Sequence, residues 1–168
     1  MAKTETKDEK RARSQARAQL DSIVGMVKRL NHCQECDGAD CELSDEEILT
    51  GINIFYKEGM KASPEDHKEY HDEEAIRQTI QEDPLSLEVR SDWHSPGEDS
   101  GPLDFMILLC TGGPAVRIIG ELDEHQQPES AAIEYQDWFT PWERYGGTTS
   151  EEDEILLTYA LQFYFGEC

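Results

Sequence analysis

The chain carries a group of three cysteines in its first third, Cys33, Cys36 and Cys41. Two cysteines separated by two residues can coordinate a zinc ion, and a tetrahedral site then needs further sulfur or nitrogen ligands. His71 supplies the fourth ligand in our prediction, and His32 and His67 are the alternatives. The sequence therefore predicts a candidate zinc site at Cys33, Cys36, Cys41 and His71.

Two other interpretations of this cysteine loop stay open. A single pair at this spacing also occurs in loops that bind no metal, and a second such pair is missing here. A redox-active pair is the third interpretation, but the strand-to-helix setting of a thioredoxin motif is not apparent around Cys33 and Cys36. The acidic residues nearby would add negative charge to a site that already holds thiolates.

Cys110 is a candidate nucleophile, with His94 or His125 as its base. Such a pair depends on geometry that a sequence does not contain. Cys110 ends an apolar run before Gly112-Gly113, where a small buried thiol is the ordinary occupant. The glycine pair also lacks the lysine and the spaced glycines of a phosphate-binding loop. We therefore predict a catalytic role neither for Cys110 nor for this loop, and we expect no catalytic residue.

Acidic side chains form the second candidate site. Clustered carboxylates can imitate the phosphates of a duplex and occupy a Lys/Arg groove built for nucleic acid. Exposed tryptophans would add specificity, because Trp is enriched in interface hot spots. The predicted partner-binding residues are Asp45, Glu46, Glu47, Glu65, Asp66, Glu69, Asp72, Glu73, Trp93 and Trp142. A solvated face that binds no partner is the alternative.

The charge of the chain is unevenly distributed. Residues 1–31 carry eight Lys/Arg and four Asp/Glu, whereas the remainder carries seven Lys/Arg and thirty-three Asp/Glu. The two parts therefore have formal charges of about +4 and −26, within a total of −22. Such an acidic body repels nucleic acid and anionic membranes and attracts basic surfaces. We expect a protein partner with a basic nucleic-acid-binding groove, and no direct binding of nucleic acid or membrane.

Length and composition limit the class of protein. The 168 residues suit one domain of ordinary size, and 37% apolar residues are enough for a core. No apolar run is long enough to span a bilayer, and the first residues lack the apolar stretch of a secretory signal. Five cysteines are an odd number, which favours a reducing cytoplasm over an extracellular disulfide framework.

Hydrophobic periodicity predicts an α+β domain spanning residues 1–168. Residues 1–15 form a frayed or solvated helix, 16–83 a helical half, and 84–168 a sheet with a C-terminal core helix packed on it. The expected helices cover 16–30, Ser44 to near Gly59, Ser63 to a residue before Pro84, and Glu154–Phe165, the last capped near Ser150. The expected strands form a four-stranded antiparallel meander of 87–93, 103–110, 115–122 and 130–138.

One segment resembles known proteins. The phrases SLEVRSDWHSP, ILLCTGGPAVRIIGELDE and YQDWFTPWERY, between Ser86 and Tyr145, are similar to those of small, uncharacterised acidic proteins of bacterial phages and plasmids. The resemblance implies a mobile-element context, where small acidic proteins often resemble inhibitors of host nucleases and CRISPR effectors. It carries over no activity and no functional residue.

Two functions follow as hypotheses. The first is a non-catalytic acidic inhibitor that mimics nucleic acid and blocks a host defence enzyme, of the anti-CRISPR or anti-restriction type. The second is a zinc-stapled protein–protein adaptor or regulator that uses the Cys33–Cys41 loop.

Overall fold

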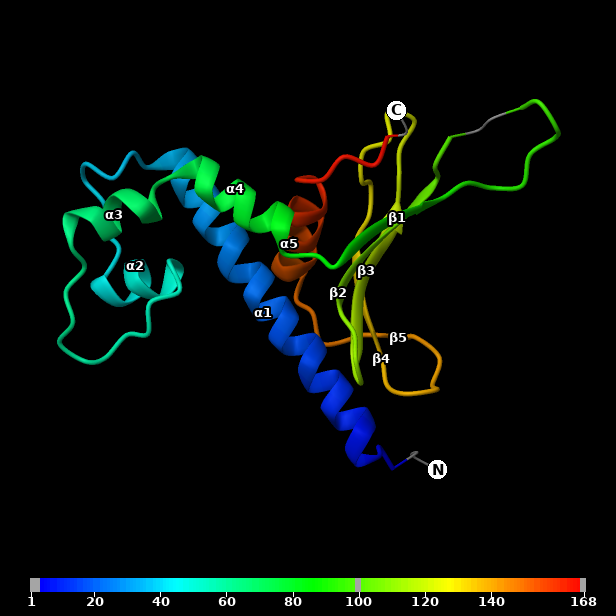
Figure 1. Ribbon diagram of the computed structural model, residues 1–168, viewed down its shortest axis with the longest axis horizontal. Coiled ribbons are helices and arrows are strands. Elements are labelled where there is room, and N and C mark those ends of the chain that lie inside the picture. The colour runs from blue at the N-terminus through cyan, green and yellow to red at the C-terminus, as the bar shows by residue number, and fades with distance from the viewer. Residues whose placement is uncertain (1–3, 99–100, 167–168) are drawn as a thin grey trace. The chain divides into compact units, whose positions relative to one another are not determined.

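A computed structural model describes residues 4–98 and 101–166 of the chain. The described residues form five helices and five strands, which confirms the α+β class (Figure 1). They divide into two compact units, a sheet unit of Met1–Val24 with Glu82–Cys168 and a helical unit of Gly25–Gln81. Among the described residues, no helix has the length and apolar character needed to cross a membrane.

The sheet unit contains a five-stranded antiparallel sheet in the order β1-β2-β3-β4-β5. The strands are β1 Ser86–Arg90, β2 Asp104–Cys110, β3 Ala115–Glu121, β4 Ala132–Gln136 and β5 Glu143–Arg144. The predicted meander is therefore correct, but its strand count of four is one too low. A strand of two residues has no period that a sequence pattern could reveal.

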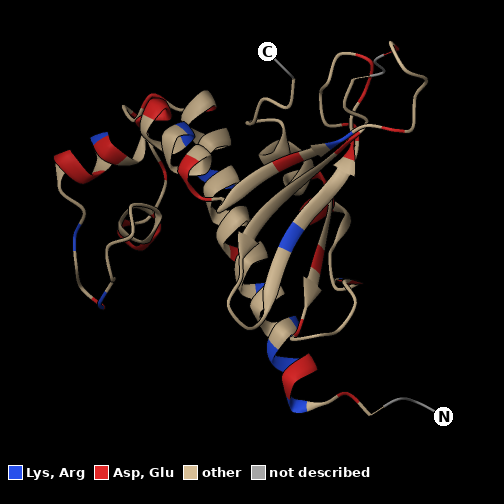
Figure 2. Ribbon diagram, turned by 45° about the vertical axis from the view of Figure 1, so that its right-hand side comes forward, with Lys and Arg blue, Asp and Glu red and all other residues tan. Residues whose placement is uncertain are grey.

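Alternation along the strands places the core on one face of this sheet. Phe105, Ile107 and Leu109 are buried, whereas the residues between them are half-buried. The first turns of helix α1 (Lys7–Glu35) and helix α5 (Ser150–Ala160) cover the buried face (Figures 1 and 2). Among the described residues of the sheet unit, no helix lies over the other face. Helix α5 buries Tyr159 completely, and the hydroxyl of Tyr159 donates a 2.6 Å hydrogen bond to Asp83 Oδ2.

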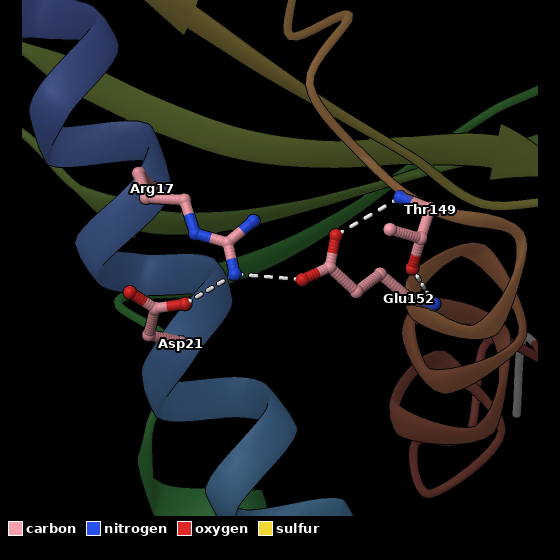
Figure 3. A network of polar contacts seen from close by, with 4 residues as sticks. All are labelled: Arg17, Asp21, Thr149 and Glu152. Atoms are coloured by element: carbon pink, nitrogen blue, oxygen red, sulfur yellow. Dashed lines mark hydrogen bonds and ion pairs between the residues drawn. The ribbon is translucent and has the colours of Figure 1, made fainter.

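A polar network links helices α1 and α5 within the sheet unit (Figure 3). Thr149, not the expected Ser150, is the N-cap of α5, and it forms a capping box with Glu152. The second carboxylate oxygen of Glu152 accepts a 2.6 Å hydrogen bond from Arg17, which also pairs with Asp21. These hydrogen bonds raise the pKa of Arg17 and fix the position of α5 against α1.

Helix α1 begins earlier than its apolar pattern suggests. Its first described turn starts at Lys7, and Ala12 is fully buried although the residues around it are charged. Of the predicted frayed stretch 1–15, residues 1–3 lie outside the described residues. The expected apolar stripe of Leu20, Ile23, Val24, Val27 and Leu30 is confirmed except at Val24, which is half-buried.

The helical unit combines the last turns of α1 with three short helices, α2 (Asp45–Gly51), α3 (Pro64–Tyr70) and α4 (Glu73–Glu82). Ser44 with Glu47 and Ser63 with Asp66 form capping boxes, so both predicted helix starts are confirmed. The ends differ from our predictions. Helix α2 stops at Gly51 rather than near Gly59, because the chain turns through a left-handed residue, Asn53.

The predicted helix between Ser63 and Pro84 is two helices. His71 caps the C-terminus of α3, and Asp72 Oδ1 accepts a hydrogen bond from the Ala75 amide at the start of α4. A carboxylate that accepts a backbone N–H in this way competes with continuation of a helix. The break places His71 at a helix end, where its ring is turned into the helical unit.

Arg29 is a buried cation that joins α1 to the ends of α2 and α3. Its guanidinium donates to the carbonyl oxygens of Tyr70 (2.9 Å), Gly51 (3.1 Å) and Glu69 (2.5 Å). The last carbonyls of a helix have no partner within the helix, and Arg29 supplies donors to three of them. The Tyr70 carbonyl also accepts from the Cys33 thiol, and the Glu69 carbonyl also accepts from the Asp72 amide. Its guanidinium also lies 5.4 Å from the centre of the Tyr70 ring.

Candidate metal centre

Four potential ligands converge in the helical unit. His32 lies in the last turn of α1, Cys36 directly follows that helix, Cys41 lies in the loop after it, and His71 is the C-cap of α3. One ligand atom of each residue lies within 4.8 Å of the others, and Cys41 Sγ is 3.4 Å from His32 Nε2. All four residues are half-buried. The group can hold a metal ion.

The hydrogen bond of His71 determines which of its nitrogens is available. Nδ1 lies 2.7 Å from the carbonyl oxygen of His67. Because a carbonyl only accepts, Nδ1 carries the proton and Nε2 presents a lone pair. Metal-binding histidines are commonly held in this way by a hydrogen bond from the second ring nitrogen.

The Nε2 atom of His71 is buried and has no hydrogen-bond partner among the described residues. Leaving a buried acceptor unsatisfied costs about 1–3 kcal/mol, so such atoms are rare and call for an explanation. A metal ion at the centre of the group would supply the missing partner. Among the described residues, this atom is the observation that most favours a metal ion at the group.

A glycine allows the loop to approach the His71 ring. Gly38 has a φ of +88°, a conformation that favours glycine, and a Cβ atom there would lie 3.3 Å from Cγ and Nδ1 of His71. A larger residue would push the loop away from the ring. Gly38 thus lets the chain pass close to one ligand on its way from Cys36 to Cys41.

The local electrostatics disfavour free thiolates. Burial raises the pKa of Cys41, and the neighbouring Cys36 raises it further, while the backbone amide of Leu43 opposes them. Two adjacent thiolates repel each other unless a cation lies between them. A bound metal would deprotonate both thiols and balance their charge.

The structure brings together three of the four predicted ligands: Cys36, Cys41 and His71. The fourth member of the group is His32, and the prediction of Cys33 is wrong. The Cys33 thiol instead donates to the carbonyl oxygen of Tyr70 at 3.1 Å. Helix α1 continues through Glu35, and the Cys36 amide still bonds to the His32 carbonyl, so residues four apart share one face. A histidine four residues before a cysteine on a helix was the signal that identifies His32.

Several predicted partner-binding carboxylates have roles within the helical unit. Glu47 and Asp66 complete capping boxes, Asp45 accepts from Lys61 and from the Ala62 amide, and Glu73 pairs with Arg77. Asp72 accepts from the Ala75 amide at the start of α4. Asp72 and the other three predicted carboxylates, Glu46, Glu65 and Glu69, are exposed and form no ion pair in the described part of the chain. Acidic residues occur in both units (Figure 2).

The two predicted tryptophans belong to the sheet unit. Trp93 is fully exposed in the loop between β1 and β2. Trp142 is half-buried, and its ring lies 4.1 Å from the guanidinium carbon of Arg117, which also pairs with Glu134. Arg117 therefore lies between the Trp142 ring and the Glu134 carboxylate.

Cys110 lies in surroundings that do not activate a thiol. Burial raises its pKa, although hydrogen bonds from the Val116 backbone and from the side chains of Gln15 and Gln19 oppose this rise. His94 and His125 are both exposed, and His125 faces Glu124. A nucleophilic cysteine needs the opposite shift of its pKa.

Comparison with known proteins finds no matching family model, no matching curated protein and no matching solved structure. The candidate function therefore depends on the geometry of the chain alone.

Proposed function

We propose that the protein is a non-catalytic binding protein whose helical unit is stapled by a zinc ion at His32, Cys36, Cys41 and His71. The observation that carries this proposal is the buried, unpartnered Nε2 of His71 within a group of four potential ligands. The zinc-stapled unit would recognise another protein, as an adaptor or regulator does.

The donor set favours zinc over other cations. Sulfur and imidazole nitrogen ligands suit zinc, whereas magnesium and calcium prefer oxygen. Two thiolates and two neutral imidazoles balance the charge of a divalent ion and fill its four tetrahedral positions. A site without an open position is structural rather than catalytic. Its thiols must stay reduced, which suits the cytoplasm.

The metal would join short segments of the helical unit to one another. The loop that carries Cys41 and the end of α3 meet the end of α1 at this site, and Ile48, Ile52 and Tyr70 form one buried cluster of the unit, beside further buried residues such as Leu30 and Ile76. Small units of this kind often depend on a structural metal. Zinc binding should therefore be coupled to folding of the helical unit.

Metal content measured on the purified full chain tests the staple. We expect one zinc per chain in the wild type, loss of zinc in Cys41→Ser, and retention in Cys33→Ser. The two substitutions are chemically identical, but only Cys41 belongs to the group of ligands. A wild type without zinc, or equal loss in both variants, would contradict the proposal.

A nucleic-acid decoy is the second candidate function. Its specific support is the set of exposed carboxylates without ion pairs, on α2, on α3 and just before α4 of one unit: Glu46, Glu65, Glu69 and Asp72. Side chains of this charge attract a basic groove and bind it less strongly as salt rises. The partner would be a host defence enzyme of the CRISPR or restriction type.

Competition with DNA separates the two functions. A partner captured from a host lysate at low salt should be released by duplex DNA if the protein is a decoy. The double variant Glu65→Gln/Glu69→Gln should then bind more weakly, and Glu124→Gln, an exposed acid of the sheet unit, should bind normally. A partner that DNA does not release would contradict the decoy and support the adaptor.

A further inference from the structure

Strand β1 forms an open edge of the sheet. It pairs with β2 along Ser86–Arg90, and in the part of the chain that the structure describes no strand pairs with its other side. The opposite edge, β5, is only two residues long. An unpaired edge presents backbone donors and acceptors that can accept a further strand.

The side chains along this edge are unusually apolar for exposed positions. Leu85, Leu87 and Val89 are 59%, 43% and 39% exposed, and they occupy alternate positions. In a strand, alternate residues lie on one face, so Leu87 and Val89 of β1 form an apolar stripe, and Leu85 directly precedes the strand. Edge strands that bind nothing usually avoid such a stripe.

The other face of β1 carries one acid and one base. Glu88 and Arg90 alternate with the apolar residues, and both are exposed, with the Arg90 side chain 81% accessible and paired to Asp104. Glu88 forms no ion pair among the described residues. Opposite charges two residues apart on a strand can be matched by a second copy of the same strand running in the opposite direction.

We propose that β1 pairs antiparallel with β1 of a second copy of this chain, about a two-fold axis at Val89. In this register Glu88 lies opposite Arg90 of the second copy, Arg90 lies opposite its Glu88, and the two Val89 side chains meet. Directly opposed residues in antiparallel strands are close enough for opposite charges to stabilise the pair. The two five-stranded sheets become one continuous sheet with isologous symmetry.

Charge selects this register over its neighbours. An axis at Glu88 would place two glutamates opposite each other, which is destabilising. An axis at Leu87 would place Arg90 opposite Pro84, which has no N–H to donate and no charge. Only the axis at Val89 pairs both charges of each strand, so the second copy is the occupant that the edge fits.

Sedimentation velocity on the full-length protein tests the pairing. At physiological salt, the wild type should shift from monomer to dimer as its concentration rises from micromolar to hundreds of micromolar. Glu88→Arg and Arg90→Glu each replace two attractive pairs by two repulsive ones. Each variant alone should therefore weaken the dimer by about tenfold or more.

A mixture of the two variants gives the decisive result. In a mixed dimer every position 88 again faces an opposite charge at position 90, so an equimolar mixture should restore association. Glu124→Arg and Arg144→Glu make the same charge changes at exposed sites away from β1, and they should leave the dimer unchanged. Thermal melting of each variant checks that the fold is intact.

Three outcomes would overturn the proposal: a wild type that stays monomeric throughout, a dimer that the edge variants weaken no more than the controls do, or a mixture that fails to associate. The pairing uses the sheet unit and no metal ligand. A failure of zinc binding would therefore leave the pairing result unaffected.

Discussion

Replacement of Arg29 by methionine should destabilise the helical unit more than any other single change to a charged residue there. Methionine keeps much of the length and volume of the side chain but donates no hydrogen bond. The substitution removes three donors from the carbonyl oxygens of Gly51, Glu69 and Tyr70. It also removes the guanidinium that lies over the Tyr70 ring.

The structure sets the size of the effect. A hydrogen bond from a charged donor contributes about 1.5–3 kcal/mol, and three such bonds would exceed the whole effect of most substitutions. The guanidinium is buried, but its bonds to Gly51 and Glu69 are only partly so, and water can replace some of them. We therefore expect the free energy of unfolding to fall by about 3–5 kcal/mol, a large share of the stability of a small unit.

Urea unfolding followed by far-ultraviolet circular dichroism measures this loss, with zinc present at a fixed concentration. Lys28→Met is the matched control, because Lys28 is the exposed neighbour on the same helix. Arg29→Lys should fall between the two, since an ammonium cannot reach all three carbonyls in one plane. Equal unfolding midpoints for Arg29→Met and Lys28→Met would refute the reasoning.

Three further measurements test other parts of the structure. Hydrogen bonds from Ser63 lower the pKa of Asp66 below its ordinary 3.8. Ionised Asp66 therefore contributes to the stability of the fold above the unfolded pKa, and this contribution is lost as the pH falls through the lower folded pKa. The urea midpoint of unfolding should therefore drop more for the wild type than for Asp66→Asn as the pH falls from above 3.8 to below the folded pKa of Asp66. Equal drops would contradict the contribution of the capping box. Glu152→Gln should lower the free energy of unfolding by about 1 kcal/mol, because it weakens the hydrogen bond to the half-exposed Arg17. Glu151→Gln changes an exposed neighbour and should leave the free energy of unfolding almost unchanged; thermal unfolding measures both. Phe139→Asn should raise the free energy of unfolding by about 0.5–1 kcal/mol, because Phe139 has a φ of +61°, which asparagine adopts more easily, and is 98% exposed. A similar gain in Phe55→Asn, at another exposed phenylalanine, would show that backbone conformation is not the cause.

The sequence alone predicts the elements that depend on neighbouring residues. The capping boxes at Ser44 and Ser63 join residues three apart, and the alternation around Ile107 and Ile118 reflects the two faces of a strand. These local rules are enough to establish the α+β class. Local rules do not predict where a helix begins or ends, because a single hydrogen bond can decide that position. The break at His71 and the N-cap at Thr149 are the two examples in this chain.

The candidate metal site could be predicted only in part. Cysteine spacing identifies Cys36 and Cys41, and the pattern leaves His32 and Cys33 as rivals on one helix. Their ranking depends on how α1 is rotated against the end of α3, where Tyr70 accepts hydrogen bonds from both Arg29 and Cys33. That rotation is set by packing between segments about forty residues apart, which no local pattern encodes.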